Sequence, residues 1–278
     1  ILATQYFYDG NEEGETHNTT PESLDLHRFL NTMSKNNLKY VTMEVASQAT
    51  KLDRVFGMHY DIGAFLNIGE DHISPIEHDD FNDYLNCKIE FLTMCDKVII
   101  YKQTDYYDEI IEKIKDKEVI TYGITSDCDY YVKDVTPYDD KITFNVVHNN
   151  EEESYYITMR GTFNCLNATC AMIMAKLLGA TQESIQKGLS ETHVEGRMEV
   201  IEDSVGPIVV DFAHNRISAE AFYKSIEDTY KGKRIVSVFG CPGGRGMHRR
   251  RDMGTCAGEH ADYIYLTADD PCGKSVTD

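Results

Sequence analysis

Short apolar runs alternate with amphipathic segments over residues 22–124. Runs rich in β-branched and aromatic residues predict strands, whereas apolar residues spaced three and four apart predict helices. The predicted strands are 39–46, 62–68, 97–101 and 118–124, accompanied by predicted helices at 22–36, 80–95 and 105–116. Thr20 is the candidate N-cap of the first helix, with Pro21 at its first position. This alternation is typical of a parallel sheet covered by helices.

Residues 128–160 break the alternation. Two β-rich runs, 141–147 and 154–159, are separated by turn residues rather than by a helix, which predicts an antiparallel appendage. Helical patterns follow at 164–178 and 182–189.

A second alternating block begins after Glu195-Gly196-Arg197, the predicted domain boundary. Its predicted elements are strands 207–213, 234–240 and 262–268 and helices near 217–230 and 250–260. A chain of 278 residues can bury two cores. We therefore expect an α/β protein with domains at 1–196 and 197–278.

Charge and composition exclude several classes of protein. The chain has 47 acidic and 27 basic residues and a net charge of −20, which argues against binding to nucleic acid. The longest apolar stretch, 171–178, is too short to span a bilayer and contains Lys176, and the N-terminus lacks a secretory pattern. The eight cysteines form no C-x-x-C pair, so no disulfide framework is expected. We expect a cytoplasmic monomer that does not insert into a membrane.

Lys88 is unusual because it lies on the apolar stripe of a predicted helix. That stripe also contains Phe81, Tyr84, Leu85, Leu92 and Cys95. Burial disfavours the charged form of an amine, which makes the neutral amine available to capture carbon dioxide as a carbamate, a carboxylate-like oxygen ligand.

Glu44 and the pair Asp71-His72 complete a candidate metal site. Glu44 lies at the end of one strand-like run and Asp71-His72 follows another, and strand ends meet in one crevice in open α/β sheets. Oxygen ligands with a single imidazole suit a hard cation such as Mg²⁺ that also holds substrate phosphate. The alternative is that Lys88 extends its amine to solvent from a core helix and His72 caps a loop.

Two further segments contain candidate ligand-binding groups. Asn164 and Asn167 are three residues apart at a predicted helix start, where two amides can bind the edges of adenine or, alternatively, serve as a cap and a surface residue. Segment 240–251 is rich in glycine and arginine and lies between a predicted strand and helix, as in a phosphate cradle, but it lacks a strict G-x-G-x-x-G pattern.

The order of these elements resembles the Mur ligases, specifically the type that adds the third amino acid to the UDP-N-acetylmuramoyl dipeptide of peptidoglycan. Nearly the whole chain is covered. The matching segments are Asn18-Thr19-Thr20-Pro21-Glu22-Ser23, Met43-Glu44-Val45-Ala46-Ser47-Gln48-Ala49, Arg54-Val55-Phe56-Gly57, Asn67-Ile68-Gly69-Glu70-Asp71-His72, Lys88, Gly161-Thr162-Phe163-Asn164-Cys165-Leu166-Asn167-Ala168, Gly196-Arg197-Met198-Glu199, Asp211-Phe212-Ala213-His214 and Asp269-Asp270-Pro271.

The resemblance implies an ATPase-type domain at 1–196 and a Rossmann-like ligase domain at 197–278. It implies ATP and Mg²⁺ as cofactors and an acyl phosphate that an amino acid attacks. The implied metal ligands are Glu44, His72 and carbamylated Lys88, with His72 and Lys88 acting in catalysis. The implied ATP-binding residues are Asn164, Asn167, Arg197, Asp211 and His214. The implied residues for the muramoyl dipeptide are Thr19, Thr20, Ser47 and Arg54, and those for the free amino acid are Arg250, Asp269 and Asp270.

Two departures from the family pattern limit these expectations. The family's Gly-Lys-Thr or Gly-Lys-Ser phosphate loop and its UDP-binding domain have no counterpart in these residues. We therefore expect a fragment that is inactive alone, from a parent ligase. Diaminopimelate-adding members carry Asp-Asn-Pro-Arg where this chain has Asp269-Asp270-Pro271-Cys272, so lysine or a similar diamino acid is the expected substrate.

Two other functions remain open at this point. A folylpolyglutamate synthase-like ligase belongs to the same superfamily, although the Thr19-Thr20-Pro21, Ser47 and Arg54 set favours a muramoyl substrate. A non-catalytic nucleotide-binding scaffold is the alternative from a different class.

Overall fold

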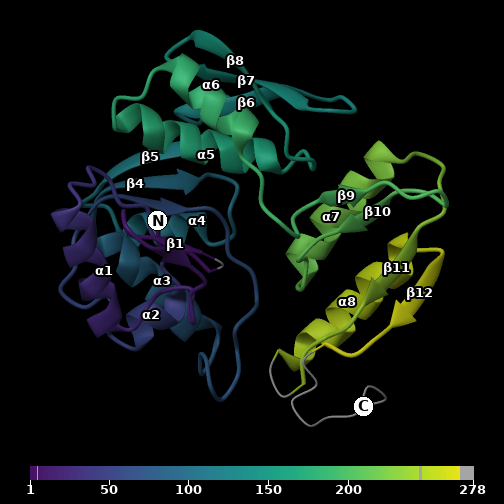
Figure 1. Ribbon diagram of the computed structural model, residues 1–278, viewed down its shortest axis with the longest axis horizontal. Helices are drawn as coiled ribbons and strands as arrows, with labels where there is room; N and C mark the ends of the chain where they lie inside the picture. Colours follow the sequence, from purple (N-terminus) through teal and green to yellow (C-terminus); the bar gives the residue numbers. More distant parts are fainter. Residues whose placement is uncertain (5, 244–245, 270–278) are drawn as a thin grey trace. The chain divides into compact units, whose positions relative to one another are not determined.

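A computed structural model describes residues 1–4, 6–243 and 246–269 (Figure 1). Its helices are α1 (Ser23–Lys35), α2 (Ser47–Lys51), α3 (Phe81–Thr93), α4 (Tyr107–Lys113), α5 (Asn164–Leu177), α6 (Gln182–Glu191), α7 (Arg216–Thr229) and α8 (Met247–His260). Its strands are β1 (Phe7–Tyr8), β2 (Glu13–Gly14), β3 (Tyr60–Phe65), β4 (Cys95–Tyr101), β5 (Glu118–Gly123), β6 (Tyr130–Pro137), β7 (Ile142–His148), β8 (Glu151–Ile157), β9 (Glu199–Ile201), β10 (Ile208–Val210), β11 (Val236–Phe239) and β12 (Tyr263–Leu266). No helix in these ranges is long and apolar enough to cross a membrane.

The largest sheet has the strand order β3-β4-β5-β6-β7-β8. A helix intervenes between β3 and β4 and between β4 and β5, the connectivity of a parallel α/β sheet. β5 and β6 are parallel, whereas β6, β7 and β8 form an antiparallel meander. The expected α/β architecture is therefore confirmed, and the antiparallel appendage continues the same sheet.

Two predictions about the N-terminal region are wrong. Segment 39–46 forms an isolated bridge between Leu2 and Met43 rather than a strand, with backbone bonds from the Leu2 N–H to the Thr42 carbonyl and from the Glu44 N–H to the Leu2 carbonyl. Thr20 is not the cap of α1, because the helix begins at Ser23 after Glu22.

The chain divides into two compact units. The first comprises Ile1–Gly63, Ile73–Val98 and Asp108–Glu118, and the second comprises Ala64–His72, Ile99–Tyr107 and Val119–Asp278. In the first unit, Leu26 and Met33 of α1 pack with Leu2, Ala49 and Val55, all of them almost completely buried. Thr20 and Glu44 lie in loops between the segments that supply this core, and Ser47 begins α2, which contributes Ala49 to it.

The second unit contains two groups of elements that pack together. Helices α5 and α6 pack against the β6-β7-β8 meander (Figure 1). Farther along the chain, α7 and α8 pack together, and Ala219 and Tyr223 of α7 form a buried cluster with Met253, Cys256 and Ala257 of α8. Strands β11 and β12 form a parallel pair, as expected for an α/β block.

Candidate active site

Thr20 connects two loops of the first unit. Its side chain is fully buried, and its hydroxyl donates to the Glu44 carbonyl and accepts from the Ala46 N–H, each over 2.9 Å. A buried hydroxyl needs such partners, since leaving it unpaired costs about 1–3 kcal/mol. The contacts fix the backbone on both sides of Glu44, although that segment is not a strand.

Thr4 holds the exposed side chain of Glu44 in place. The Thr4 hydroxyl and backbone N–H donate to Glu44 Oε2 over 2.6 and 3.0 Å. The Thr4 and Thr19 hydroxyl oxygens lie 3.1 Å apart, so Thr19 belongs to the same network. The Glu44 carboxylate is thus held in one orientation rather than rotating freely at the surface.

Arg54 lies at the edge of this network. Its Nη1 donates to the Thr20 carbonyl over 3.3 Å and its Nη2 lies 2.8 Å from the Glu22 carboxylate. The Arg54 side chain is 12% exposed, so it is not the solvated charge that a lone arginine would suggest. The first unit therefore brings together Thr19, Thr20, Glu44 and Arg54.

Ser47 begins α2 and is nearly buried, with 8% of its surface exposed. Its hydroxyl lies 2.9 Å from Nε2 of His78, a residue that was not among the sequence candidates. Lys88 is half-buried in α3, as its place on the apolar stripe predicts, and its Nζ lies 5.3 Å from the centre of the Tyr84 ring. The amine thus lies near an aromatic face, a partly apolar environment.

The second unit contains His72, with an unusual backbone. Its φ of 58° lies in the left-handed region, which costs a non-glycine residue of order 1 kcal/mol and is frequent at functional sites. The His72 N–H donates to Oδ1 of Asp71 over 2.8 Å, which stabilises this turn. The three expected metal ligands are divided between the units, with Glu44 and Lys88 in the first and His72 in the second.

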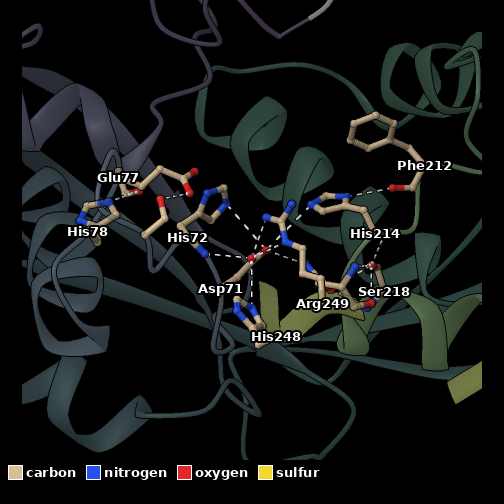
Figure 2. Close-up of polar contacts among 12 residues, drawn as sticks. Asp71, His72, Glu77, His78, Phe212, His214, Ser218, His248 and Arg249 are labelled. Atoms are coloured by element: carbon tan, nitrogen blue, oxygen red, sulfur yellow. Dashed lines mark hydrogen bonds and ion pairs between the residues drawn. The ribbon is translucent and has the colours of Figure 1, made fainter. Parts of the chain in front are cut away.

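Asp71 is the centre of a polar cluster in the second unit (Figure 2). Arg249 donates to Asp71 Oδ1 from Nε over 2.7 Å and from Nη2 over 2.6 Å, and Asn215 donates to Oδ2 over 3.1 Å. Nε2 atoms of His214 and His248 lie 3.9 and 3.7 Å from the carboxylate. Burial alone would raise the pKa of Asp71, but the charges and hydrogen bonds of His72 and Arg249 hold it below the usual value. Asp71 is therefore an ionised carboxylate that accepts hydrogen bonds from His72, Asn215 and Arg249.

The expected adenine-binding pair lies at the start of α5. Asn164 is buried and donates to the Arg160 carbonyl over 2.7 Å, while the exposed Asn167 donates to the Asn164 side-chain oxygen over 3.0 Å. The N-cap is Phe163, so Asn164 is not a capping residue. The structure brings the two amides together, as their spacing predicts.

Arg197, Asp211 and His214 lie close together where β9 and β10 begin the second block. The Arg197 guanidinium lies 4.5 Å from the centre of the Phe212 ring, and Asp211 accepts the backbone N–H groups of Met198 and Ala213, each over 2.8 Å. Burial lowers the pKa of His214. The Asp211 carboxylate thus fixes the turn that carries Arg197.

The charged residues Arg250 and Asp269 both lie near Cys241. Burial raises the pKa of the Cys241 thiol, and the charges of Arg250 and Asp269 are close enough to act on it in opposite directions. Asp269 is exposed, and the predicted site residue Asp270 lies outside the described residues.

Sequence reasoning missed several members of these networks: Thr4, His78, Asn215, His248 and Arg249. Asn215 had a detectable signal, because an asparagine three residues before Ser218 predicts the capping box that the structure shows at α7. Arg249 bonds to a residue 178 positions away, and no local pattern encodes such a pairing.

Comparison with known families supports the resemblance. The family model described as Mur ligase middle domain matches residues 1–175, and the model described as Mur ligase, glutamate ligase domain matches residues 196–278.

Individual proteins show the same relationship. A UDP-N-acetylmuramoyl-L-alanyl-D-glutamate--L-lysine ligase from Streptococcus agalactiae is 38% identical over 265 residues, covering 95% of this chain and 53% of that protein. One from Enterococcus faecalis is 36% identical over 264 residues, covering 92% of this chain and 52% of that protein. The solved structure of a UDP-N-acetylmuramoyl-L-alanyl-D-glutamate--2,6-diaminopimelate ligase shares the fold, with a TM-score of 0.68 and 24% identity over 93% of this chain and 55% of that one. The chain spans about half the length of the curated relatives it matches.

Proposed function

Because the chain belongs to the Mur ligase family, we propose that it forms the ATP-using and amino-acid-adding parts of a peptidoglycan ligase. The reaction joins a diamino acid to UDP-N-acetylmuramoyl-L-alanyl-D-glutamate, with the acceptor carboxylate activated as an acyl phosphate. Domains at 1–196 and 197–278 are part of this proposal, and the family matches at residues 1–175 and 196–278 support it. The nucleotide substrates assign the reaction to the cytoplasm.

The observation that carries the proposal is the Thr20 network in the first unit. Buried Thr20 connects the loop of Thr19 to the loop of Glu44, and Arg54 donates to the same residue. This arrangement presents the hydroxyl groups of Thr19 and Thr20, the carboxylate of Glu44 and the guanidinium of Arg54. These residues come from three of the segments that match the family pattern. Such a combination suits a substrate that bears amide, carboxylate and phosphate groups.

The donor set fits a divalent cation of the Mg²⁺ type. Glu44 supplies an oriented carboxylate, His72 an imidazole and Lys88, once carbamylated, a second anionic oxygen group. Mg²⁺ would offset the repulsion between the ATP phosphates and the acceptor carboxylate. In this proposal, Asn164 and Asn167 bind adenine, which their mutual hydrogen bond supports, and Arg197, Asp211 and His214 contact the nucleotide.

The substrate amino acid is lysine in this proposal. Arg250 offers a bidentate partner for the backbone carboxylate, and Asp269 supplies negative charge near the same segment. A second substrate carboxylate, as in diaminopimelate, would approach this acid unfavourably. The names of the relatives at 36–38% identity also support lysine.

Isotope transfer tests the acyl-phosphate route. The complete protein that carries this chain is incubated with ATP, Mg²⁺, lysine and a dipeptide nucleotide labelled with ¹⁸O in its acceptor carboxylate. The proposal predicts ¹⁸O in the released phosphate, because the carboxylate oxygen bridges to phosphorus before the amine displaces it. Unlabelled phosphate together with formation of the tripeptide would contradict this route.

A further inference from the structure

His78 lies at the centre of a buried hydrogen-bond chain in the first unit. The residue is fully buried, its Nε2 lies 2.9 Å from Ser47 Oγ, and its Nδ1 lies 3.1 Å from Asp83 Oδ2. The same Asp83 oxygen accepts from Lys51 Nζ over 2.5 Å and from the Asp79 N–H over 3.1 Å. This series of hydrogen bonds therefore connects Lys51 through Asp83 and His78 to Ser47.

The charge state of Asp83 determines which ring nitrogen carries the proton. The hydrogen bond from Lys51 is the main cause that lowers the pKa of Asp83 to about 2, so this side chain is an ionised carboxylate and accepts only. His78 Nδ1 must then carry a hydrogen to form its bond. A buried imidazolium would need a carboxylate of its own, and Asp83 is already paired with Lys51. In the neutral ring, Nε2 is left as an acceptor.

We propose that His78 and Asp83 are positioning residues that commit the Ser47 hydroxyl hydrogen to His78 Nε2, so that Ser47 presents only its oxygen lone pairs to the substrate. Ser47 then accepts an N–H, as the peptide part of the muramoyl dipeptide offers, and does not donate to a phosphate or carboxylate oxygen. The identity of this substrate rests on the proposed function.

A cation site at the same place is the competing explanation. His78, Asp83 and Cys87 offer ligand atoms within 4.8 Å of one another. Lys51 already places a positive charge against the carboxylate, and burial raises the pKa of the Cys87 thiol to about 11, so the thiolate that a metal needs is disfavoured. The cluster is better suited to fixing a proton than to holding an ion.

The ring nitrogens of His78 give the first test, made on this 278-residue chain without substrate. Nitrogen-15 NMR should show a neutral ring with hydrogen on Nδ1 and none on Nε2, and Ser47→Ala should shift the Nε2 resonance. An Nε2–H tautomer or an imidazolium at neutral pH overturns the proposal. Asp83→Asn keeps an acceptor oxygen and should keep the tautomer, whereas the similarly sized Asp83→Leu should lose it.

Kinetics of the complete protein give the second test. Ser47→Ala and His78→Phe should each raise KM for the dipeptide nucleotide about 2- to 10-fold, the range expected for one neutral hydrogen bond, with little change in kcat or in KM for ATP. The double variant should match Ser47→Ala alone, because His78 acts through Ser47. Additive losses, or unchanged KM values, overturn the proposal. Asp79→Asn is the matched control, since Asp79 also pairs with Lys51 but is 89% exposed.

The two tests separate this proposal from the proposed function. If the wild-type protein fails to ligate the dipeptide nucleotide, the proposed function fails. The NMR measurement still decides whether His78 fixes the Ser47 hydroxyl.

Discussion

Lys88 and Glu44 are the residues on which the proposed chemistry depends most. Glu44 is held in one orientation by two hydrogen bonds from Thr4, and Lys88 is half-buried beside Tyr84. A lysine kept only for packing would tolerate replacement, whereas a carbamate ligand would not. Substitution at Lys88 therefore discriminates between the two explanations of this residue.

Lys88→Ala in the complete protein should lower ligation by at least two orders of magnitude, because a metal-supporting oxygen group would be lost. Added acetate or formate should restore part of the activity by replacing the carbamate. The measurement is kcat with and without the added acid. Lys115→Ala is the control, since Lys115 is 71% exposed and pairs only with nearby Glu112 among the contacts observed. Full activity of Lys88→Ala would refute the assignment.

Asp83 provides a prediction about pH. Its pKa is lowered to about 2 in the folded chain, below the ordinary value of about 3.9, so its ionisation stabilises the fold above pH about 4. That stabilisation is lost as the pH falls towards 2. Asp83→Asn should therefore cost about 1 kcal/mol at pH 7, a small value because Asp83 and Lys51 are 28% and 26% exposed, and almost nothing near pH 2. Urea unfolding of both proteins across this range measures the difference, and a difference independent of pH would contradict it.

Residue types in the site could be inferred from the sequence more readily than their contacts. The positions of Asn164 and Asn167 follow from helical spacing, and their hydrogen bond confirms it. Thr20 was expected to cap α1 but bonds to Glu44, 24 residues away. A threonine followed by proline fits the local pattern of a helix cap. Its hydrogen bond to Glu44 depends instead on tertiary packing, which the local pattern does not contain.

At the scale of elements, Gly240 shows how closely two segments approach. A Cβ at this position would lie 2.5 Å from the Thr267 carbonyl oxygen and 3.0 Å from the Asp269 nitrogen, both backbone atoms that cannot move aside easily. The ends of β11 and β12 therefore require glycine here, next to the segment that carries Asp269.

Gly240→Ala should destabilise the chain by about 2 kcal/mol or more, because the added methyl forces the backbone of β11 or the segment after β12 to shift. Gly254→Ala is the matched control. Gly254 lies inside α8 with open space around it, so the same substitution should stabilise the helix by about 0.5–1 kcal/mol. Thermal and urea unfolding should give opposite signs for the two variants, and equal signs would contradict this account.

Long periodic elements could be predicted from the sequence, and so could several strands, but some short segments could not. Helices α3, α5 and α7 agree with their apolar spacing to within a few residues. Segment 39–46 has strand-like composition, yet within the described part of the chain it forms an isolated bridge with Leu2 rather than a ladder with another strand. Helix α2, of five residues, is too short to show a periodic pattern. The conformation of such short segments depends on their pairing partners more than on local propensity.

For the whole molecule, the net charge of −20 opposes anionic substrates at long range. In the proposed function, binding of ATP and a UDP-linked substrate would therefore depend on local cations such as Arg54, Arg197 and Arg250. Arg54 and Arg197 lie within segments that match the family pattern, and the resemblance to the family implies a binding role for Arg250. The acidic surface and the basic binding residues are thus compatible with a nucleotide-dependent ligase.

The most direct test of this account is the product formed by the complete protein. It is supplied with UDP-N-acetylmuramoyl-L-alanyl-D-glutamate, ATP, Mg²⁺ and equal concentrations of lysine and meso-diaminopimelate, and the nucleotide product is identified by mass spectrometry. The account predicts a tripeptide nucleotide that contains lysine and forms only with ATP. A product containing diaminopimelate would contradict the specificity inferred from Arg250 and Asp269, and the absence of any ATP-dependent amide product would contradict the ligase function itself.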